Sequence, residues 1–252
     1  RAFFESYPDR PLSEVTGLDI EHAIAGKSAA TYTRYRNMIA AILHVAERAG
    51  WINKAPRIGS RKQPPGRIRW ITREEWTRLD AELPDHLRPL ARFAIATGLR
   101  QANVLRLRWR EIDLARRVMW VQPDESKARK PIGLPLSAEA VEVLRDQLGK
   151  HDEWVFPYEN KREKIDGKPR VGPMREIGNA FGRACTRAGI KDFTWHDLRH
   201  TWATWHIMAG TPVEVLQKLG GWSDIRMVLR YAHFAPEYLA GFQAEGYTIP
   251  LA

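Results

Sequence analysis

Apolar residues first recur at helical spacing in the segment "SAATYTRYRNMIAAILHVAERAGWI". The apolar positions share one face of a helix: Tyr35, Met38, Ile39, Ile42, Val45, Ala46 and Ala49. Ser28 can cap this helix and Gly50 can end it. Upstream, "LSEVTGLDIEHAI" predicts a shorter helix that starts near residues 17–19. Residues 1–53 are therefore predicted to form a small all-helical domain.

The remaining chain carries mostly helical patterns and a few short strand patterns. Thr72 and Glu75 form a capping box, and "LRPLARFAIATGLR" predicts a helix that ends at Gly98. "VMWVQ" and "PIGLPL" are typical of strands, so the intervening "PDESKARK" indicates a β-hairpin. Further helices are predicted over 173–188, 195–209, 212–219 and 224–233, with "NKREKIDGKPRVGP" as a polar loop and "PEYLAGFQAE" as a final helix. The pattern predicts a mainly α fold with a small antiparallel β-sheet or hairpin.

A basic stretch separates these two parts. From Asn53 to Trp70 the chain has six basic residues, three prolines, two glycines and no acidic residue. Such a segment does not form a helix or a central strand. We expect residues 54–70 to be an extended linker that leads to a second domain over 71–252. The linker could lie along a phosphate backbone or be a solvated tether, and the sequence leaves both open.

The net charge of the chain limits the class of molecule that it is expected to bind. The chain has 252 residues and a net charge of +10, which attracts polyanions such as nucleic acid or an anionic membrane. A well-solvated surface is the alternative explanation. The single cysteine excludes an intramolecular disulfide or a multi-cysteine zinc cluster and fits a reducing cytosol. No apolar run approaches the ~20 residues that span a bilayer. No signal peptide is visible, and the missing initiator methionine predicts an N-terminally truncated chain.

The segment "FTWHDLRHTWATWH" combines an imidazole and a guanidinium at the start of a helix. Thr194 and Asp197 form another capping box, which places His196 and Arg199 three residues apart on the first turn. A helix N-terminus with a guanidinium suits a phosphate, and imidazole can carry a proton near neutral pH. This pattern also occurs in helices where it is purely structural.

Three further residues indicate a function only when they are considered together. Arg100 lies between apolar stretches, so it is expected to be partly buried and to need an anionic partner, which could be an internal carboxylate. Trp222 precedes Tyr231 by nine residues. Tyr231 shares helical spacing with Met227, Val228 and Phe234, which is also the pattern of a packed core tyrosine.

The order of these groups along the chain is informative, since a lysine-bearing hairpin lies between Arg100 and His196. At this point the sequence resembles the tyrosine recombinase (phage integrase) family, through "TGLR", "SKARKPIGLPL", "HDLRHTWAT" and "LGGWSDIRMVLRYAH". The resemblance spans about residues 12–240 and is greatest to integrases of temperate phages and genomic islands. It implies a small helical core-type DNA-binding domain and an α-rich catalytic domain with a C-terminal helix that contacts a neighbouring protomer.

The resemblance also implies roles for individual residues. Tyr231 would attack the scissile phosphate to give a 3′-phosphotyrosyl bond and a free 5′-hydroxyl. Arg100 and Arg199 would grip the phosphate and stabilise its growing charge, and His196 would assist proton transfer. Nearby cations are expected to favour the phenolate of Tyr231. Trp222 can donate one hydrogen bond but cannot shuttle a proton, so we expect it to position and pack.

The leaving 5′-oxygen needs a proton, which the family takes from a lysine on a β-hairpin. Lys127 matches best, although Lys130 and Arg129 are close enough to leave the choice open. Asn103 stands where many members carry an acidic residue, and His200 and His233 are expected to be packed or surface histidines. No metal ion and no cofactor are implied. Besides Arg129 and Lys130, the basic residues expected to contact DNA are Arg34, Arg36, Arg61, Lys62, Arg67 and Arg69.

The implied partner is double-stranded DNA with attachment-type sites. The protein would integrate or excise a mobile element as a homotetramer on DNA and be a monomer in free solution, without a membrane. It would act in the bacterial host cytoplasm or nucleoid, with accessory DNA-bending and directionality factors as further partners. A catalytically silent DNA-binding relative and a type IB topoisomerase that relaxes supercoils remain as alternatives.

Overall fold

The computed structural model describes residues 10–62, 66–121 and 131–234. The hairpin residues Lys127, Arg129 and Lys130 and the helix predicted after Tyr231 lie outside the described residues. The chain separates into two compact units, Arg1–Arg67 and Ile68–Ala252. Each unit has its own hydrophobic core.

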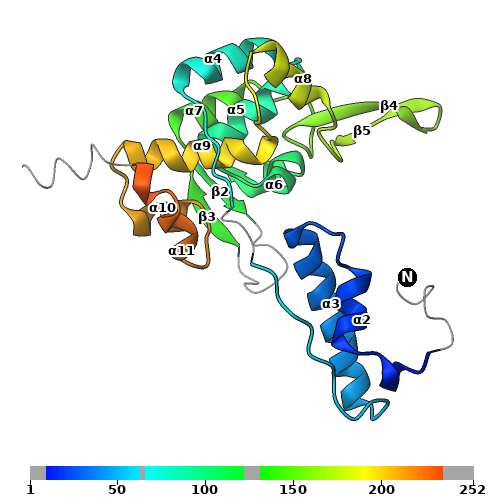
Figure 1. Cartoon of the computed structure of the whole chain (residues 1–252). Helices are drawn as coiled ribbons and strands as arrows, with labels where there is room; N and C mark the ends of the chain where they lie inside the picture. Colours follow the sequence, from blue (N-terminus) through cyan, green and yellow to red (C-terminus); the bar gives the residue numbers. More distant parts are fainter. Residues whose placement is uncertain (1–9, 63–65, 122–130, 235–252) are drawn as a thin grey trace, which may run out of the picture. The chain divides into compact units, whose positions relative to one another are not determined.

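The first unit is helical in its described part (Figure 1). After the 3₁₀ turn η1 (Leu12–Glu14) it contains α2 (Gly17–Ala23) and α3 (Ala29–Arg48). The Thr16 hydroxyl accepts a hydrogen bond from the Asp19 N–H, and the Ser28 hydroxyl accepts one from Thr31. Both predicted helices are therefore confirmed, because each start is specified by a local capping residue.

The apolar face predicted for α3 does not all point inward. Tyr35, Met38, Ile42 and Val45 share that face as predicted, but they are 40–52% exposed and do not line the core of the first unit. The buried residues of α3 are instead Tyr32, Leu43 and Ala46. They pack against three partner segments, represented by Ile20, Ile24, Ile52 and Ile58. Which face of α3 is buried depends on the segments that cover the helix, and the periodicity of its apolar residues does not reveal those segments.

Part of the predicted linker belongs to the first unit. Ile58 is buried in that unit's core. The Gly59 N–H donates to Glu21 Oε1 at 2.6 Å, and the Tyr32 hydroxyl donates to the Gly59 carbonyl at 3.2 Å. At the other end, Ile71 is fully buried in the second unit. The stretch free of either core is thus shorter than residues 54–70.

The second unit is built around α9 (Trp195–Met208), which packs against α5 (Arg88–Thr97) on one side and α10 (Val213–Leu219) on the other (Figure 1). Leu198 of α9 joins the large core, whereas Trp202, Ala203 and Ile207 join a smaller cluster near the end of the described chain. The other helical elements are α4 (Arg73–Glu82), α6 (Gln101–Leu105), η2 (Trp109–Glu111), α7 (Ala138–Arg145), α8 (Ala180–Arg187), α11 (Arg226–Leu229) and η3 (Ala232–Phe234).

Two small antiparallel sheets complete the second unit. β1 (Ile112–Asp113), β2 (Val118–Val121) and β3 (Ile132–Pro135) pair in that order, with Met119 opposite Leu134. β4 (Pro157–Ile165) and β5 (Lys168–Pro173) form a separate two-stranded hairpin. The predicted mainly α fold with a small antiparallel sheet is confirmed.

The β4–β5 hairpin corrects the polar loop predicted over "NKREKIDGKPRVGP". The two strands are joined by Asp166 and Gly167, whose φ angles are 50° and 78°. An Asp-Gly pair with positive φ at both positions is a favoured two-residue hairpin turn, so the sequence did carry a signal for this element. The many charged side chains concealed it, because strands of a projecting hairpin need not alternate polar and apolar residues. Among the described residues, no helix is long and apolar enough to cross a bilayer.

Candidate active site

The first turns of α9 hold the groups that the sequence singled out. The Thr194 N–H and hydroxyl both donate to Asp197 Oδ2, at 2.7 Å and 2.8 Å, which confirms the predicted capping box. This start places His196 at the surface, whereas Arg199 and His200 are only 5% and 8% exposed. The helix therefore presents one imidazole outward and buries a guanidinium and a second imidazole.

Arg199 is oriented by the ends of two other helices. Its Nη1 donates to the Gly98 carbonyl at 2.6 Å, and its Nη2 donates to the Gly220 carbonyl at 2.5 Å. These glycines are the C-caps of α5 and α10, where backbone carbonyls lack helical partners. The guanidinium carbon lies 4.2 Å from the centroid of the Trp222 ring. Since carbonyls carry no formal charge, these two bonds fix the fork without neutralising it.

Gly98 is required at its position for two reasons. Its φ is +64°, and a Cβ there would overlap the Trp202 ring. We expect Gly98→Ala to lower the free energy of unfolding by about 1–2 kcal/mol from the left-handed backbone. The overlap should add about 1–3 kcal/mol. Urea unfolding of the two proteins measures the difference.

Gly149 is the matched control for that substitution. Its φ is +77°, but a Cβ there would meet nothing within 4 Å. Gly149→Ala should therefore show only the backbone contribution. Equal losses in both variants would mean that Trp202 moves aside and that no steric contact fixes the carbonyl that holds Arg199.

Tyr231 lies between α11 and η3 and is 2% exposed. A hydrogen bond of 2.6 Å joins its hydroxyl to Nδ1 of His200. The Trp222 ring packs 6.0 Å from the Tyr231 ring, and both belong to the small cluster with Trp202 and Val228. Met227 is 38% exposed, so Val228 provides the buried contact on this helix and Met227 does not. Tyr231 is thus a packed residue whose hydroxyl faces a buried imidazole.

Burial governs the protonation of this pair. It raises the pKa of Tyr231 above its usual value, although the charges of Arg199 and Arg230 oppose the rise. The predicted effect of nearby cations is present, since Arg199 and Arg230 favour the phenolate, but desolvation outweighs them in the free protein. Burial, together with His196, lowers the pKa of His200 to about 4. Both groups are neutral at pH 7.

His196 lies beside the two arginines. Although His196 reaches the surface, the groups packed around its imidazole partly desolvate it and lower its pKa, and the positive charges of Arg199 and Arg100 lower it further. Arg100 stands at the N-cap of α6, immediately after the α5 end that holds Arg199. The His196 and His200 rings are 4.9 Å apart and nearly perpendicular. The structure thus gathers five predicted residues around the start of α9: Arg100, His196, Arg199, Trp222 and Tyr231.

His200 is the site residue that sequence reasoning missed, since it was expected to be a packed or surface histidine. Its burial fits that expectation, but its hydrogen bond to the Tyr231 hydroxyl does not. A partial signal was present: His200 follows His196 by four residues, so both imidazoles lie on one face of a helix. The facing partner could not be read from the sequence.

The basic residues predicted to contact DNA differ in their surroundings. Arg36 donates to the Ile58 and Gly59 carbonyls, and Arg61 lies 4.1 Å over the Tyr32 ring and donates to the Ala25 carbonyl. These two arginines support the first unit. The others in the described part are surface-exposed: Arg34, Lys62 and Arg67.

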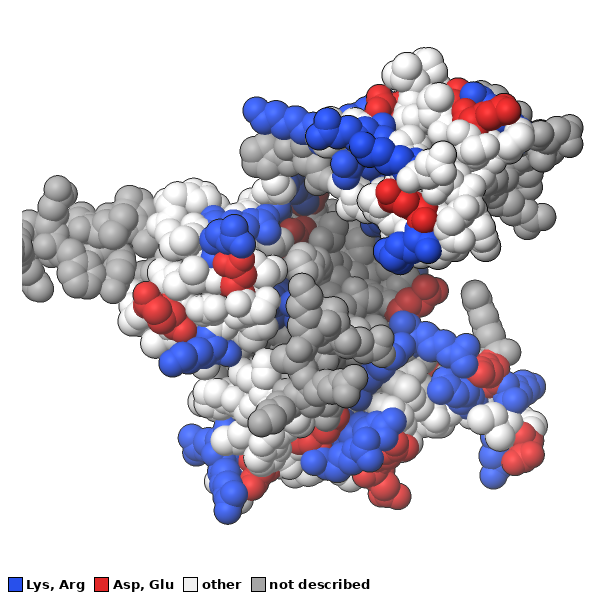
Figure 2. Space-filling model, turned by 90° about the horizontal axis from the view of Figure 1, so that it is seen from below, with Lys and Arg blue, Asp and Glu red and all other residues white. Residues whose placement is uncertain are grey.

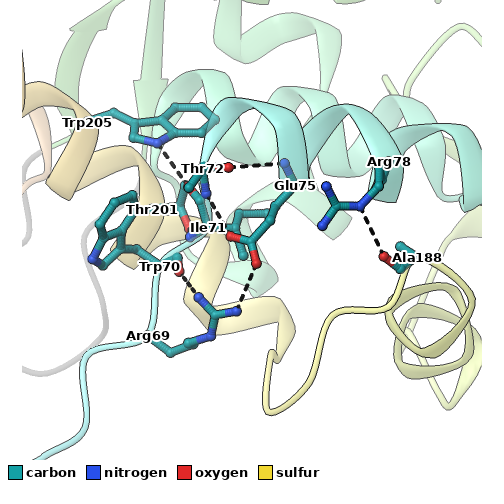
Figure 3. A network of polar contacts seen from close by, with 9 residues as sticks. All are labelled: Arg69, Trp70, Ile71, Thr72, Glu75, Arg78, Ala188, Thr201 and Trp205. Atoms are coloured by element: carbon teal, nitrogen blue, oxygen red, sulfur yellow. Dashed lines mark hydrogen bonds and ion pairs between the residues drawn. The ribbon is translucent and has the colours of Figure 1, made fainter.

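Arg69 is engaged at the start of the second unit (Figure 3). It donates to the Trp70 carbonyl and lies 3.3 Å from Glu75 Oε1. In the same network the Ile71 N–H donates to the Thr201 hydroxyl, and Trp205 donates to the Ile71 carbonyl at 3.0 Å. The Ile71 bonds attach the incoming chain to α9, and the Arg69 contacts hold its guanidinium beside the start of α4.

Figure 2 shows lysine and arginine side chains spread over the face drawn, with acidic side chains among them. This distribution accords with the net charge of +10. Within residues 10–62, 66–121 and 131–234, no three His, Cys, Asp or Glu side chains group closely enough to hold a metal ion.

Comparison with known proteins places this site in context. A model of the phage integrase family matches residues 69–237. An integrase of Salmonella phage P22 is 44% identical over 217 residues, which cover 84% of this chain and 56% of that protein. An integrase of Escherichia phage 186 is 30% identical over 177 residues, covering 68% and 45%. The chain spans about half the length of these relatives.

Solved structures show the same fold. A lambda integrase dimer bound to a COC′ core site matches with a TM-score of 0.71 and 20% identity, covering 92% of this chain and 84% of that chain. The XerH recombinase bound to palindromic difH in a post-cleavage complex matches with a TM-score of 0.69 and 17% identity, covering 97% and 76%.

Proposed function

Because the chain belongs to the phage integrase family, we propose that it is a site-specific DNA recombinase that cuts and rejoins strands through a 3′-phosphotyrosyl intermediate. Such a protein integrates or excises a mobile element. One observation supports the proposal most. The Tyr231 hydroxyl bonds to the buried His200 imidazole, and Trp222, which packs beside Tyr231, lies against the Arg199 guanidinium.

The chemistry requires a nucleophile, charge stabilisation and a proton for the leaving group. Tyr231 Oη attacks phosphorus, the Oη–P bond forms, and the P–O5′ bond breaks. Arg199, oriented by two carbonyls, and Arg100 bind the non-bridging oxygens on which charge grows. Lys127 donates a proton to O5′ in this proposal, with Lys130 as the alternative. Since the phosphotyrosyl bond conserves the phosphodiester energy, a new 5′-hydroxyl can reverse the step.

Tyr231 must become accessible before it reacts. At 2% exposure its hydroxyl cannot meet a DNA phosphate, and its raised pKa disfavours the phenolate. The element that carries it is short, since α11 has four residues and η3 three. Short elements have few internal hydrogen bonds to break, so we expect DNA binding to expose the Tyr231 hydroxyl to the phosphate without separating it from His200. The free protein would thereby avoid cutting unspecific DNA.

The proposed partner is double-stranded DNA with attachment-type sites. DNA-bound neighbours support this proposal, since the lambda integrase is bound to a COC′ core site and XerH to palindromic difH. One active site cuts one strand, so exchange between two duplexes would use a homotetramer on DNA, formed from monomers. Accessory DNA-bending and directionality factors would choose the direction. The place of action would be the cytoplasm or nucleoid of a bacterial host.

Trapping on a suicide substrate tests the function. A duplex carrying the attachment site and a nick next to the scissile phosphate loses the short 5′-hydroxyl fragment after cleavage, so rejoining is prevented. We expect a covalent protein–DNA adduct on a denaturing gel, specific to the attachment site. Binding without any adduct would indicate a silent DNA-binding relative. Adducts on unrelated DNA together with relaxation of a supercoiled plasmid would indicate a topoisomerase.

A further inference from the structure

A buried imidazole lies in direct contact with the reacting oxygen of the proposed nucleophile. His200 Nδ1 is 2.6 Å from the Tyr231 hydroxyl, and within the described chain no other group forms a hydrogen bond with that hydroxyl. We propose that His200 is the general base that takes the Tyr231 proton during attack and returns it during rejoining. This inference rests on the proposed recombinase function and goes beyond it, because the family resemblance gives the proton-transfer role to His196.

The geometry separates the two histidines. His196 is exposed at the surface and faces the charges of Arg100 and Arg199, which suits contact with phosphate oxygens. His200 is buried one turn further along α9 and meets Tyr231. A base must lie within hydrogen-bond distance of the proton it removes, and only His200 does so here among the described residues.

The proposed step balances in atoms and charge. As the Oη–P bond forms, the phenol proton moves to the Nδ1 lone pair and His200 becomes an imidazolium. The P–O5′ bond breaks, and O5′ leaves with a proton from a separate donor. In rejoining, a 5′-hydroxyl attacks phosphorus, the Oη–P bond breaks, and the His200 imidazolium returns its proton to Tyr231. The same proton moves twice, so no oxidant, metal ion or cofactor takes part in it.

Charged groups around His200 set when it can act. His196, Arg199 and Arg230 lower its pKa, Asp197 raises it, and burial is the largest effect, so the free protein holds a neutral imidazole. A base with a pKa of about 4 is weak. An arriving phosphate brings negative charge, which stabilises the imidazolium and raises the pKa. DNA binding would thereby strengthen the base at the moment that it is needed.

His200→Asn tests the assignment. The Asn amide oxygen can accept the hydrogen bond from Tyr231 but cannot hold its proton. We expect single-turnover cleavage to slow about 10²–10⁴-fold, with DNA affinity unchanged. The wild-type rate should rise with pH as His200 loses its proton in the complex, and this acid limb should vanish in His200→Asn. An undiminished rate in the variant would overturn the proposal.

A DNA substrate with sulfur at the bridging 5′ position distinguishes a general base at Tyr231 from a general acid at the leaving group. When sulfur replaces the bridging O5′, the thiolate leaves without needing a proton. If His200 serves Tyr231, the defect of His200→Asn persists on this substrate. Restoration of the rate by sulfur would instead place His200 at the leaving group and overturn the proposal. A wild-type protein that forms no adduct at all would contradict the recombinase function itself, which is a separate outcome.

His206 provides the matched control. It lies on the same helix, its pKa is also lowered by burial, and its Nδ1 is 3.0 Å from the Thr211 hydroxyl. His206→Asn should keep the wild-type rate and pH profile. If His200→Asn does not fold, His200→Gln allows the same rate comparison. Nitrogen NMR of wild-type His200 requires no variant: an unprotonated, hydrogen-bonded Nδ1 is expected, and a protonated Nδ1 would overturn the assignment.

Discussion

Tyr231→Phe is expected to abolish the covalent adduct with nicked attachment-site DNA while DNA binding persists. The phenyl ring fills the space of the phenol in the small cluster, but the nucleophilic oxygen is gone. The substitution also leaves Nδ1 of the buried His200 without its partner. An unsatisfied buried polar group costs about 1–3 kcal/mol, so the free energy of unfolding should fall by that amount. Denaturing gels and urea unfolding measure the two effects.

Tyr32→Phe is the matched control in the first unit. Tyr32 is also 2% exposed, and its hydroxyl donates to the Gly59 carbonyl at 3.2 Å. This variant should lose less stability, because Arg36 still donates to the Gly59 carbonyl, and it should still form the adduct at saturating DNA. An adduct in Tyr231→Phe would show that another residue is the nucleophile. Loss of the adduct in both variants would point to damaged DNA binding.

Features that depend on neighbours in sequence were predictable. The capping boxes of Thr72 with Glu75 and of Thr194 with Asp197 fixed the starts of α4 and α9, because both partners lie within one turn. Gly98 likewise predicted the end of α5, since only a left-handed residue closes that helix as observed. Local chemistry was sufficient for these boundaries.

Features that depend on distant partners were not predictable. The exposed residues of α3, such as Met38 and Ile42, have the same periodicity as buried ones, and only the covering segments distinguish them. The β4–β5 hairpin is intermediate: its Asp-Gly turn is local, but its charged strands do not show the usual alternation. Sequence pattern reports the period of an element more reliably than the side that is covered.

The candidate site shows the same division. The order of Arg100, His196, Arg199, Trp222 and Tyr231 predicted a shared site, and the structure gathers these residues around α9. The partners of Arg199 could not be predicted, because they are backbone carbonyls 101 and 21 residues away along the chain. The contact of His200 with a tyrosine 31 residues away depends on how η3 packs onto α9 and α11 onto α10. Residue identity indicated the chemistry, whereas tertiary packing determined which imidazole meets Tyr231.

Arg199→Lys should also have a large effect, although the charge is kept. The guanidinium donates at once to the Gly98 and Gly220 carbonyls and stacks on Trp222, which a single ammonium group cannot reproduce. In the recombinase chemistry the fork would also lose its fixed aim at the phosphate. Loss of one preorganised donor costs about 10²–10³-fold in rate, so single-turnover cleavage should slow by at least that factor.

Arg226→Lys is the matched control, because the Arg226 side chain is 84% exposed and pairs only with the neighbouring Asp224 in the described structure. It should leave cleavage and unfolding unchanged. Measuring stability distinguishes a structural role of Arg199 from a role at the phosphate. An unpaired carbonyl in Arg199→Lys costs about 1–3 kcal/mol of folding free energy. That loss would slow cleavage only if the protein unfolded under assay conditions. Slow cleavage by folded, DNA-bound Arg199→Lys would therefore assign the guanidinium to the phosphate. Wild-type cleavage rates with reduced stability would confine Arg199 to joining α5, α9 and α10.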